Sequence, residues 1–161
     1  MPRIDPVPID PDGNPVTNSV LARVLARRPE ILRAYARLDN AVRFHGLLAL
    51  ELKEAVRRAT AGEIGCAYCA SLGAPRTDLD AREALAVAFA EAVARDPAGI
   101  TDGQFEVLRE EFSEDEIVEL VAFICLVAIS GQMFGAVMRL EATGPEEAAA
   151  YQDVLAGRSR H

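Results

Sequence analysis

Residues 51–69 read ELKEAVRRATAGEIGCAYC, and they combine a helical run with two cysteines that lie three residues apart. The first part is rich in Ala, Leu, Glu and Arg, which are strong helix formers. It predicts a helix from about residue 47 to residue 61. The glycines at positions 62 and 65 then favour a break, so we expect Cys66 and Cys69 on the first turn of a new helix.

The rest of the chain continues this helical pattern, and no window shows the alternation typical of a strand. Asn18 or Ser19 can cap a short helix that ends near Pro29, which suits the first turn of the next helix. Three further helices begin at capping-box patterns, whose first residues are Asp80, Thr101 and Ser113. We expect Gly144 and Pro145 to end the last of these helices and to start a short terminal one.

These elements predict an all-α fold, a compact multi-helix bundle with short connections. The chain has 161 residues, which is the length of one domain. Residues 1–17 contain five prolines and one glycine, so they predict an extended N-terminal arm. The single helical domain is then expected over residues 18–157.

Composition limits the partners and the location that we expect. The formal net charge is −8, and an acidic protein repels phosphate backbones, so no nucleic-acid partner is expected. The first 15 residues lack the apolar core of a signal peptide, and the chain has only three cysteines. These features predict a cytoplasmic protein in a reducing compartment, where a close cysteine pair is more often catalytic or metal-binding than structural.

Residues 120–138, LVAFICLVAISGQMFGAVM, are mostly apolar and almost long enough to span a membrane. Ser130, Gly131 and Gln132 interrupt the segment, and no basic flank would orient it. We therefore expect a buried central helix or a subunit interface, and no membrane partner. Cys125 lies in the most apolar part of the segment and is expected to be a buried thiol.

The cysteine pair has three possible interpretations. A structural zinc site needs four ligands, and the chain offers only Cys125, His45 and His161 besides the pair, so neither a metal nor another cofactor is expected. Two buried structural thiols are the second interpretation. The third is a redox pair, because backbone N–H groups at a helix start favour a thiolate and one helical turn brings two such cysteines together as a disulfide.

The stretch 51–69 resembles the signature of the carboxymuconolactone decarboxylase and alkyl hydroperoxidase D-like family. In that family a glutamate lies about three helical turns before a G-C-x-x-C pair, and Glu54 lies twelve residues before Cys66. The segment DPAGITDGQFEVLREEFSEDEIVELVAFI, residues 96–124, is also similar to the family, and the resemblance covers roughly residues 20–140. By helical spacing alone, the glutamate could instead pair with an arginine three or four residues later.

The resemblance implies an all-α homo-oligomer (dimer, trimer or hexamer) whose dithiol reduces hydroperoxides or the disulfide of a partner protein. It implies Cys69 as the attacking thiol, Cys66 as its disulfide partner and Glu54 as a relay base. The family motif continues as C-x-x-C-x-x-x-H, and here Gly73 replaces that histidine. The relay therefore departs from the family pattern, and Cys66 is an alternative attacking thiol.

Three more residues are candidates for the wall of the site. Tyr68 either packs in the core or offers its phenol, Gln132 lines a cavity or an interface, and His45 either reaches the site or ends a helix in solvent. The decarboxylase branch suggests a second function, a lyase that acts on a small carboxylated lactone and needs a cation such as Arg43 or Arg139. A non-catalytic oligomer is the third possibility.

Overall fold

The computed structural model describes residues 1–157, and this range contains helices and no strand. The α-helices are α1 (Val20–Leu25), α2 (Pro29–Phe44), α3 (Leu50–Ile64), α4 (Ala67–Ser71), α5 (Ala81–Arg95), α6 (Asp102–Glu111), α7 (Glu114–Ala122), α8 (Ser130–Met138) and α9 (Pro145–Leu155). A 3₁₀ turn η1 (Pro97–Gly99) precedes α6, and a π-helical segment η2 (Phe123–Ile129) joins α7 to α8. The predicted all-α fold is confirmed, and His161 lies outside the described residues.

The helix starts follow the local chemistry of the sequence. Ser19 caps α1 by accepting the N–H of Ala22, and Pro29 occupies the first turn of α2. The three predicted capping boxes are all present, at the starts of α5, α6 and α7. These reciprocal bonds satisfy N–H groups that the first helical turn leaves free.

Two predicted helix boundaries are wrong. Gly62 does not break the chain; it lies inside α3, which continues to Gly65. The long apolar helix ends at Met138 instead of Gly144, because Arg139 takes a left-handed conformation with φ 55° and its N–H bonds back to the last turn. Gly144 is instead the residue that precedes α9.

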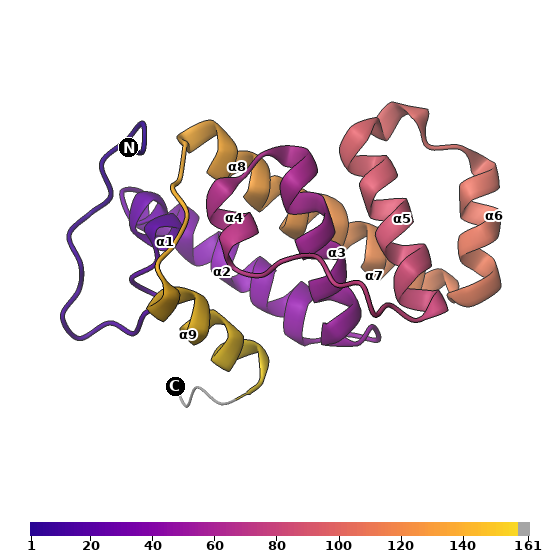
Figure 1. Ribbon diagram of the computed structural model, residues 1–161, viewed down its shortest axis with the longest axis horizontal. Helices are drawn as coiled ribbons and strands as arrows, with labels where there is room; N and C mark the ends of the chain where they lie inside the picture. The colour runs from indigo at the N-terminus through magenta and orange to yellow at the C-terminus, as the bar shows by residue number, and fades with distance from the viewer. Residues whose placement is uncertain (158–161) are drawn as a thin grey trace.

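The segments α7, η2 and α8 form one continuous helix through the centre of the bundle (Figure 1). By length and composition, Glu114–Met138 could cross a membrane. One face of this helix is buried in the core, through Ile117, Leu120, Phe123, Ile124, Val127 and Ala128. Cys125 was expected to be buried and is instead a free, exposed thiol, because it lies on the outer face of this helix.

The core has two parts. The larger one is built mainly by α3, α5, α7 and η2, and its most buried members include Val56, Ala86, Ala90, Leu108, Leu120, Phe123 and Ile124. The smaller one surrounds the cysteines and contains Val24, Ala61, Cys66, Tyr68, Cys69, Leu72 and Leu140. The helix α4 lies in the half of the bundle that also holds the N-terminal arm, α1 and α9 (Figure 1), and the cysteines pack there with residues of α1 and α9.

The N-terminal arm lies across its own domain. The N–H of Arg3 bonds to the carbonyl of Met138, and the N–H of Val7 bonds to the carbonyl of Arg23. The Arg23 guanidinium returns a bond to the carbonyl of Val7 at 2.7 Å. These contacts hold the arm along α1 and the end of α8, beside the smaller part of the core.

Candidate active site

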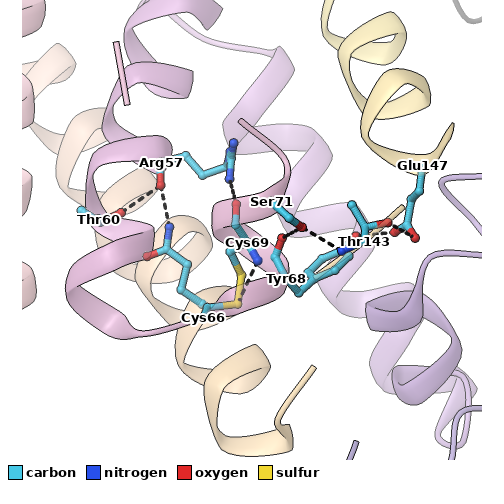
Figure 2. The surroundings of a disulfide bond; sticks show 9 residues. Arg57, Thr60, Cys66, Tyr68, Cys69, Ser71, Thr143 and Glu147 are labelled. Atoms are coloured by element: carbon cyan, nitrogen blue, oxygen red, sulfur yellow. Dashed lines mark hydrogen bonds between the residues drawn. A yellow bond between two sulfur atoms is a disulfide. The ribbon is translucent and has the colours of Figure 1, made fainter. Parts of the chain in front are cut away.

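The two cysteines lie at a sharp turn of the chain between α3 and α4. Gly65 is left-handed there, with φ 76°, and its N–H and that of Cys66 both bond to the carbonyl of Ala61. Cys66 then caps α4, because its Sγ accepts the N–H of Cys69 at 3.1 Å. The pair forms a disulfide with the Cα atoms 5.2 Å apart, a separation that suits such a bond (Figure 2). One helical turn thus brings the two sulfurs together, as the spacing predicted.

A glycine on α8 makes room for the two sulfurs. A methyl group built on Gly135 would lie 2.5 Å from Cys66 Sγ and 3.4 Å from Cys69 Sγ. The first distance is far below van der Waals contact, so only glycine lets the backbone of α8 pass this close to the pair. Close packing also explains why Cys66 is 1% exposed and Cys69 is 8% exposed.

Glu54 lies on α3 at the centre of a buried cluster of charges. Its carboxylate accepts hydrogen bonds from Arg57 at 2.7 and 2.8 Å, from Arg58 at 2.9 Å and from the Tyr151 hydroxyl at 2.9 Å. Arg43 lies 3.9 Å away. Burial alone would raise the pKa of Glu54, but the hydrogen bonds from Arg57 and Arg58 and the charges of Arg57 and Arg43 outweigh burial and hold this pKa below its usual value. Glu54 is therefore an ionised, fully engaged carboxylate.

Arg57 connects this cluster to the cysteine helix. Its Nη1 donates to the backbone carbonyl of Cys69 at 2.8 Å (Figure 2). Its Nε and Nη2 donate to the Glu54 carboxylate. The carbonyl of Arg57 in turn accepts the side-chain N–H of Gln132 at 2.8 Å. The Oε1 atom of Gln132 is buried and has no hydrogen-bond partner within residues 1–157. Glu54 thus reaches the cysteine pair through Arg57.

A cavity of about 240 Å³ opens beside the pair, and Cys69 forms part of its wall whereas Cys66 does not. Most of the wall is apolar and comes from α1, α2, η2 and α9, through residues such as Leu21, Leu25, Leu32, Val127 and Val154. Polar groups from α2, α3 and α9 also line it, namely Tyr35, Asp39, Arg43, Arg57 and Tyr151. The volume lies between that of a cavity that holds one benzene ring and that of a typical drug site, about 150 and 300 Å³. It suits a compact organic molecule.

The structure brings two of the three predicted wall residues to the cavity. Tyr68 and Gln132 line it, and His45 does not, because His45 is exposed where α2 ends. The Tyr68 hydroxyl donates to Glu147 on α9 at 2.9 Å (Figure 2). Burial, and then the charge of Glu147, raise the pKa of Tyr68 above its usual value. Tyr68 therefore acts as a packed link to α9 with its hydroxyl already engaged.

Apart from Arg43, which was a candidate cation of the lyase alternative, the sequence did not indicate the residues that α2 and α9 contribute to the site. Tyr151 lies between two charged groups, because it donates to Glu54 and its oxygen accepts a bond from Arg43 at 3.2 Å. Arg43 is itself ion-paired with Asp39 at 2.7 Å. Tyr35 projects from α2 against α8, where its hydroxyl lies next to Gly131.

Gly73 occupies the position of the family's relay histidine, and its backbone and surroundings suit a residue without a side chain. Its φ is 156°, a conformation that side chains rarely adopt. A Cβ at this position would lie 2.9 Å from Nε of Arg58, and Arg58 is bonded to Glu54 and to Gln152 on α9. A histidine side chain at this position would therefore strain the backbone and would have to move the Arg58 guanidinium.

In residues 1–157 no three His, Cys, Asp or Glu side chains are grouped so that they could hold a metal ion. The absence of a metal or other cofactor remains a prediction. The chemistry available at the site is that of the two cysteines, the two cavity arginines and the tyrosine hydroxyls.

No protein-family model matches the chain, and no curated protein does either. Solved structures do match it. A peroxidase-related protein from Ralstonia eutropha JMP134, described as an alkylhydroperoxidase AhpD core, has a TM-score of 0.66 and 20% identity over 88% of this chain and 82% of its own. A peroxidase-related protein from Silicibacter sp. TM1040 has a TM-score of 0.65 and 19% identity over 80% of this chain and 78% of its own.

The debrominase Bmp8 matches with a TM-score of 0.68 and 20% identity, over 86% of this chain and 83% of its own. A cysteine-to-alanine variant of Bmp8 has also been solved in complex with 2,3,4-tribromopyrrole. Likeness at this level of identity shows the fold. The chain therefore has an alkyl hydroperoxidase D-like fold, as the resemblance of residues 51–69 predicted.

Proposed function

We propose that this protein is a dithiol oxidoreductase that reduces hydroperoxides with the Cys66–Cys69 pair. The observation that carries this proposal is the position of Cys69, which lies on the wall of a compact apolar cavity and within disulfide distance of a second cysteine. The proposal also fits the fold, which is shared with peroxidase-related proteins.

The two cysteines have different environments, and these assign their roles. Cys69 is the attacking thiol, because it lines the cavity and Cys66 does not. Cys66 is the resolving thiol, and its sulfur accepts the N–H of Cys69, a bond that favours the thiolate form. The Cys69 thiolate attacks the terminal oxygen of the hydroperoxide, so an S–O bond forms, the O–O bond breaks and an alcohol leaves. Cys66 then attacks the Cys69 sulfenic acid, which gives the disulfide and water.

In this cycle, Glu54 is a positioning residue that holds Arg57 beside Cys69. Arg57 lines the cavity beside Cys69, and its positive charge favours the thiolate there. The lowered pKa of Glu54 makes it a weak base near neutral pH, although its role as a relay base stays a prediction. Glu54 keeps the arginine in place through two hydrogen bonds.

A small thiol or a dithiol protein would return the disulfide to the reduced pair, with its own oxidation to a disulfide. The reduction of a partner protein's disulfide is the other dithiol activity that the resemblance implies. It is less well supported by the geometry, because Cys69 is only 8% exposed and its access is through the cavity. A cytoplasmic location, where thiol reductants are abundant, fits this cycle.

Thiol counting tests the proposal. Cys125 is exposed and would also react, so we would place every variant in a Cys125→Ser background. Mild alkyl hydroperoxide should remove two thiols per chain, and Cys66→Ser should accumulate a sulfenic acid at Cys69 that a dimedone reagent traps. Cys69→Ser should leave Cys66 reduced. If both thiols of the pair survive excess hydroperoxide, the proposal fails.

A second candidate function is the reductive dehalogenation of a small halogenated ring. It is favoured by the apolar cavity at Cys69 together with the fold shared with Bmp8, a debrominase solved with a tribromopyrrole. The two thiols would supply two electrons, the ring would gain hydrogen in place of the halogen, and halide and the disulfide would form. Halide release from 2,3,4-tribromopyrrole by the reduced protein would support this candidate, and its absence beside rapid hydroperoxide reduction would exclude it.

The lyase alternative has less support. Arg43 faces the cavity but is ion-paired with Asp39, and Arg139 is exposed and outside the cavity. Neither residue is therefore available as the cationic anchor for a carboxylated lactone. Activity on such a lactone that survives the loss of both cysteines would support the lyase alternative. A non-catalytic oligomer would show neither lyase activity nor hydroperoxide reduction.

We also propose that the chain forms a homo-oligomer through the outer face of the central helix. Large apolar side chains are exposed there, namely Val118, Leu126, Met133 and Val137, which are 69%, 52%, 52% and 59% exposed. Apolar surface that continues along a helix is typical of an interface. Light scattering should give a mass above that of one chain, and Leu126→Glu should lower that mass. A monomeric starting protein would contradict this proposal.

A further inference from the structure

Tyr35 carries a hydroxyl that no other part of the described structure uses. The other two tyrosines of the cavity donate to carboxylates, Tyr68 to Glu147 and Tyr151 to Glu54. Tyr35 makes no hydrogen bond within residues 1–157, although it lines the same cavity as Cys69. The Tyr35 hydroxyl is therefore a half-buried donor without a partner in the described part of the chain. It is free to hydrogen-bond to a molecule that enters the cavity beside Cys69.

Two glycines of α8 fix the position of this hydroxyl relative to the sulfurs. A methyl group built on Gly131 would lie 2.6 Å from the Tyr35 hydroxyl oxygen, and one built on Gly135 would lie against both cysteine sulfurs. Residues four apart lie on the same helix face and are separated by about 6 Å along the axis. The Tyr35 hydroxyl and the sulfurs therefore face the same stripe of α8, one helical turn apart.

A separation on the order of one helical turn is of the size that a peroxide bond under attack requires. A thiolate approaches one peroxide oxygen to about 3–3.5 Å, and a donor holds the other oxygen at about 2.7 Å, on opposite sides of the O–O bond. When the sulfur takes the terminal oxygen, the O–O bond breaks and the oxygen attached to carbon leaves as an alkoxide. An alkoxide is a strong base, so a proton donor at that position lowers the barrier.

We infer that Tyr35 is the acid that protonates the leaving oxygen when Cys69 attacks a hydroperoxide. Burial, and then the charge of Asp39, raise the pKa of Tyr35 to about 12, so the hydroxyl carries its proton at neutral pH. The phenolate left behind is reprotonated through water by the proton that Cys69 released on ionisation. The step as a whole converts a thiol and a hydroperoxide into a sulfenic acid and an alcohol. The inference rests on the proposed hydroperoxide reduction and adds the proton source that Gly73 cannot supply.

Two oxidants that differ in their leaving group test the inference. The rate of Cys69 oxidation is measured in a single turnover with tert-butyl hydroperoxide, which releases an alkoxide, and with peroxyacetic acid, which releases a weakly basic carboxylate. Tyr35→Phe keeps the ring and removes only the hydroxyl. We expect it to slow the hydroperoxide reaction by about 10²-fold and to leave the peroxyacid reaction within about twofold.

Tyr68→Phe is the matched control, because it removes a hydroxyl of the same cavity that is already bonded to Glu147. The ratio of the two oxidation rates should stay that of the starting protein. Gly131→Ala is a second perturbation, since its methyl group would displace the Tyr35 hydroxyl without removing it. It should also slow the hydroperoxide reaction selectively.

Equal slowing of both oxidants by Tyr35→Phe would show a structural role and overturn the inference. Unchanged rates with both oxidants would overturn it too, while the proposed function would stand. If neither oxidant reacts with the pair in the starting protein, the proposed function fails first. The three failures are therefore distinguishable in one set of measurements.

Discussion

Replacing Glu54 by glutamine should lower the free energy of unfolding by about 3–5 kcal/mol at pH 7. The carboxylate is 5% exposed and accepts four hydrogen bonds of 2.7–2.9 Å from Arg57, Arg58 and Tyr151. A glutamine amide keeps one acceptor oxygen, so about half of these bonds are lost, and each bond to a charged group contributes about 1.5–3 kcal/mol. Two such losses give about 3–6 kcal/mol, which overlaps the range of about 3–5 kcal/mol expected when a buried ion pair is broken. In addition, the two guanidinium groups lose their counter-charge.

Urea unfolding followed by circular dichroism measures this change. Glu51→Gln is the matched control, because Glu51 is an exposed glutamate on the same helix, and it should change the free energy by no more than about 0.5 kcal/mol. The folded pKa of Glu54 is lowered, so its stabilisation is complete above the unfolded pKa of about 4.3 and is lost as the pH falls through the folded value. The difference between wild type and Glu54→Gln should therefore shrink in acid. A loss at pH 7 no larger than that of the control would refute the reasoning.

Three further predictions follow from the same geometry. Gly73→His should destabilise the protein by about 1–3 kcal/mol in urea unfolding, because of its backbone conformation and the nearby Arg58, and it should not raise the rate of thiol oxidation; a faster rate would contradict it. Tyr151→Phe should cost about 1.5–3 kcal/mol, since it removes the bond to the Glu54 carboxylate and the weaker bond from Arg43, and an unchanged urea midpoint would show that these bonds do not stabilise the fold. Gly135→Ala should cost about 1–3 kcal/mol in the oxidised protein, because its methyl group overlaps a cysteine sulfur, and full stability would contradict the observed packing.

The sequence predicted the helix starts well, because each start is decided by contacts within a few residues. The capping boxes at Asp80, Thr101 and Ser113 are complete within three residues and are all present. The ends were harder to predict. Gly62 stays helical, since a glycine inside a helix costs only about 1 kcal/mol and α3 is held by packing. Arg139 adopts the left-handed conformation that a glycine was expected to provide.

Some residues of the candidate site could be recognised from the sequence, and others could not. Its two cysteines and Glu54 lie on one continuous stretch of chain, so their spacing could be recognised before the fold was known. Tyr35 and Tyr151 come from α2 and α9, and their places depend on how those helices pack against α3 and α8. Cys125 was wrongly predicted to be buried, because an apolar run does not reveal which face of its helix other elements cover.

Gly73 and helix α9 are linked through the side chain of Arg58. Arg58 occupies the space that a side chain at Gly73 would need, and Arg58 bonds both Glu54 and Gln152 of α9. A histidine in that place would have to displace the arginine, and with it one bond of the buried carboxylate. The charge cluster that holds α9 over the site therefore disfavours a relay histidine beside the second cysteine. Gly73 itself has no side chain to give a proton to the leaving oxygen, and Tyr35 on α2 carries a hydroxyl that is free to supply one.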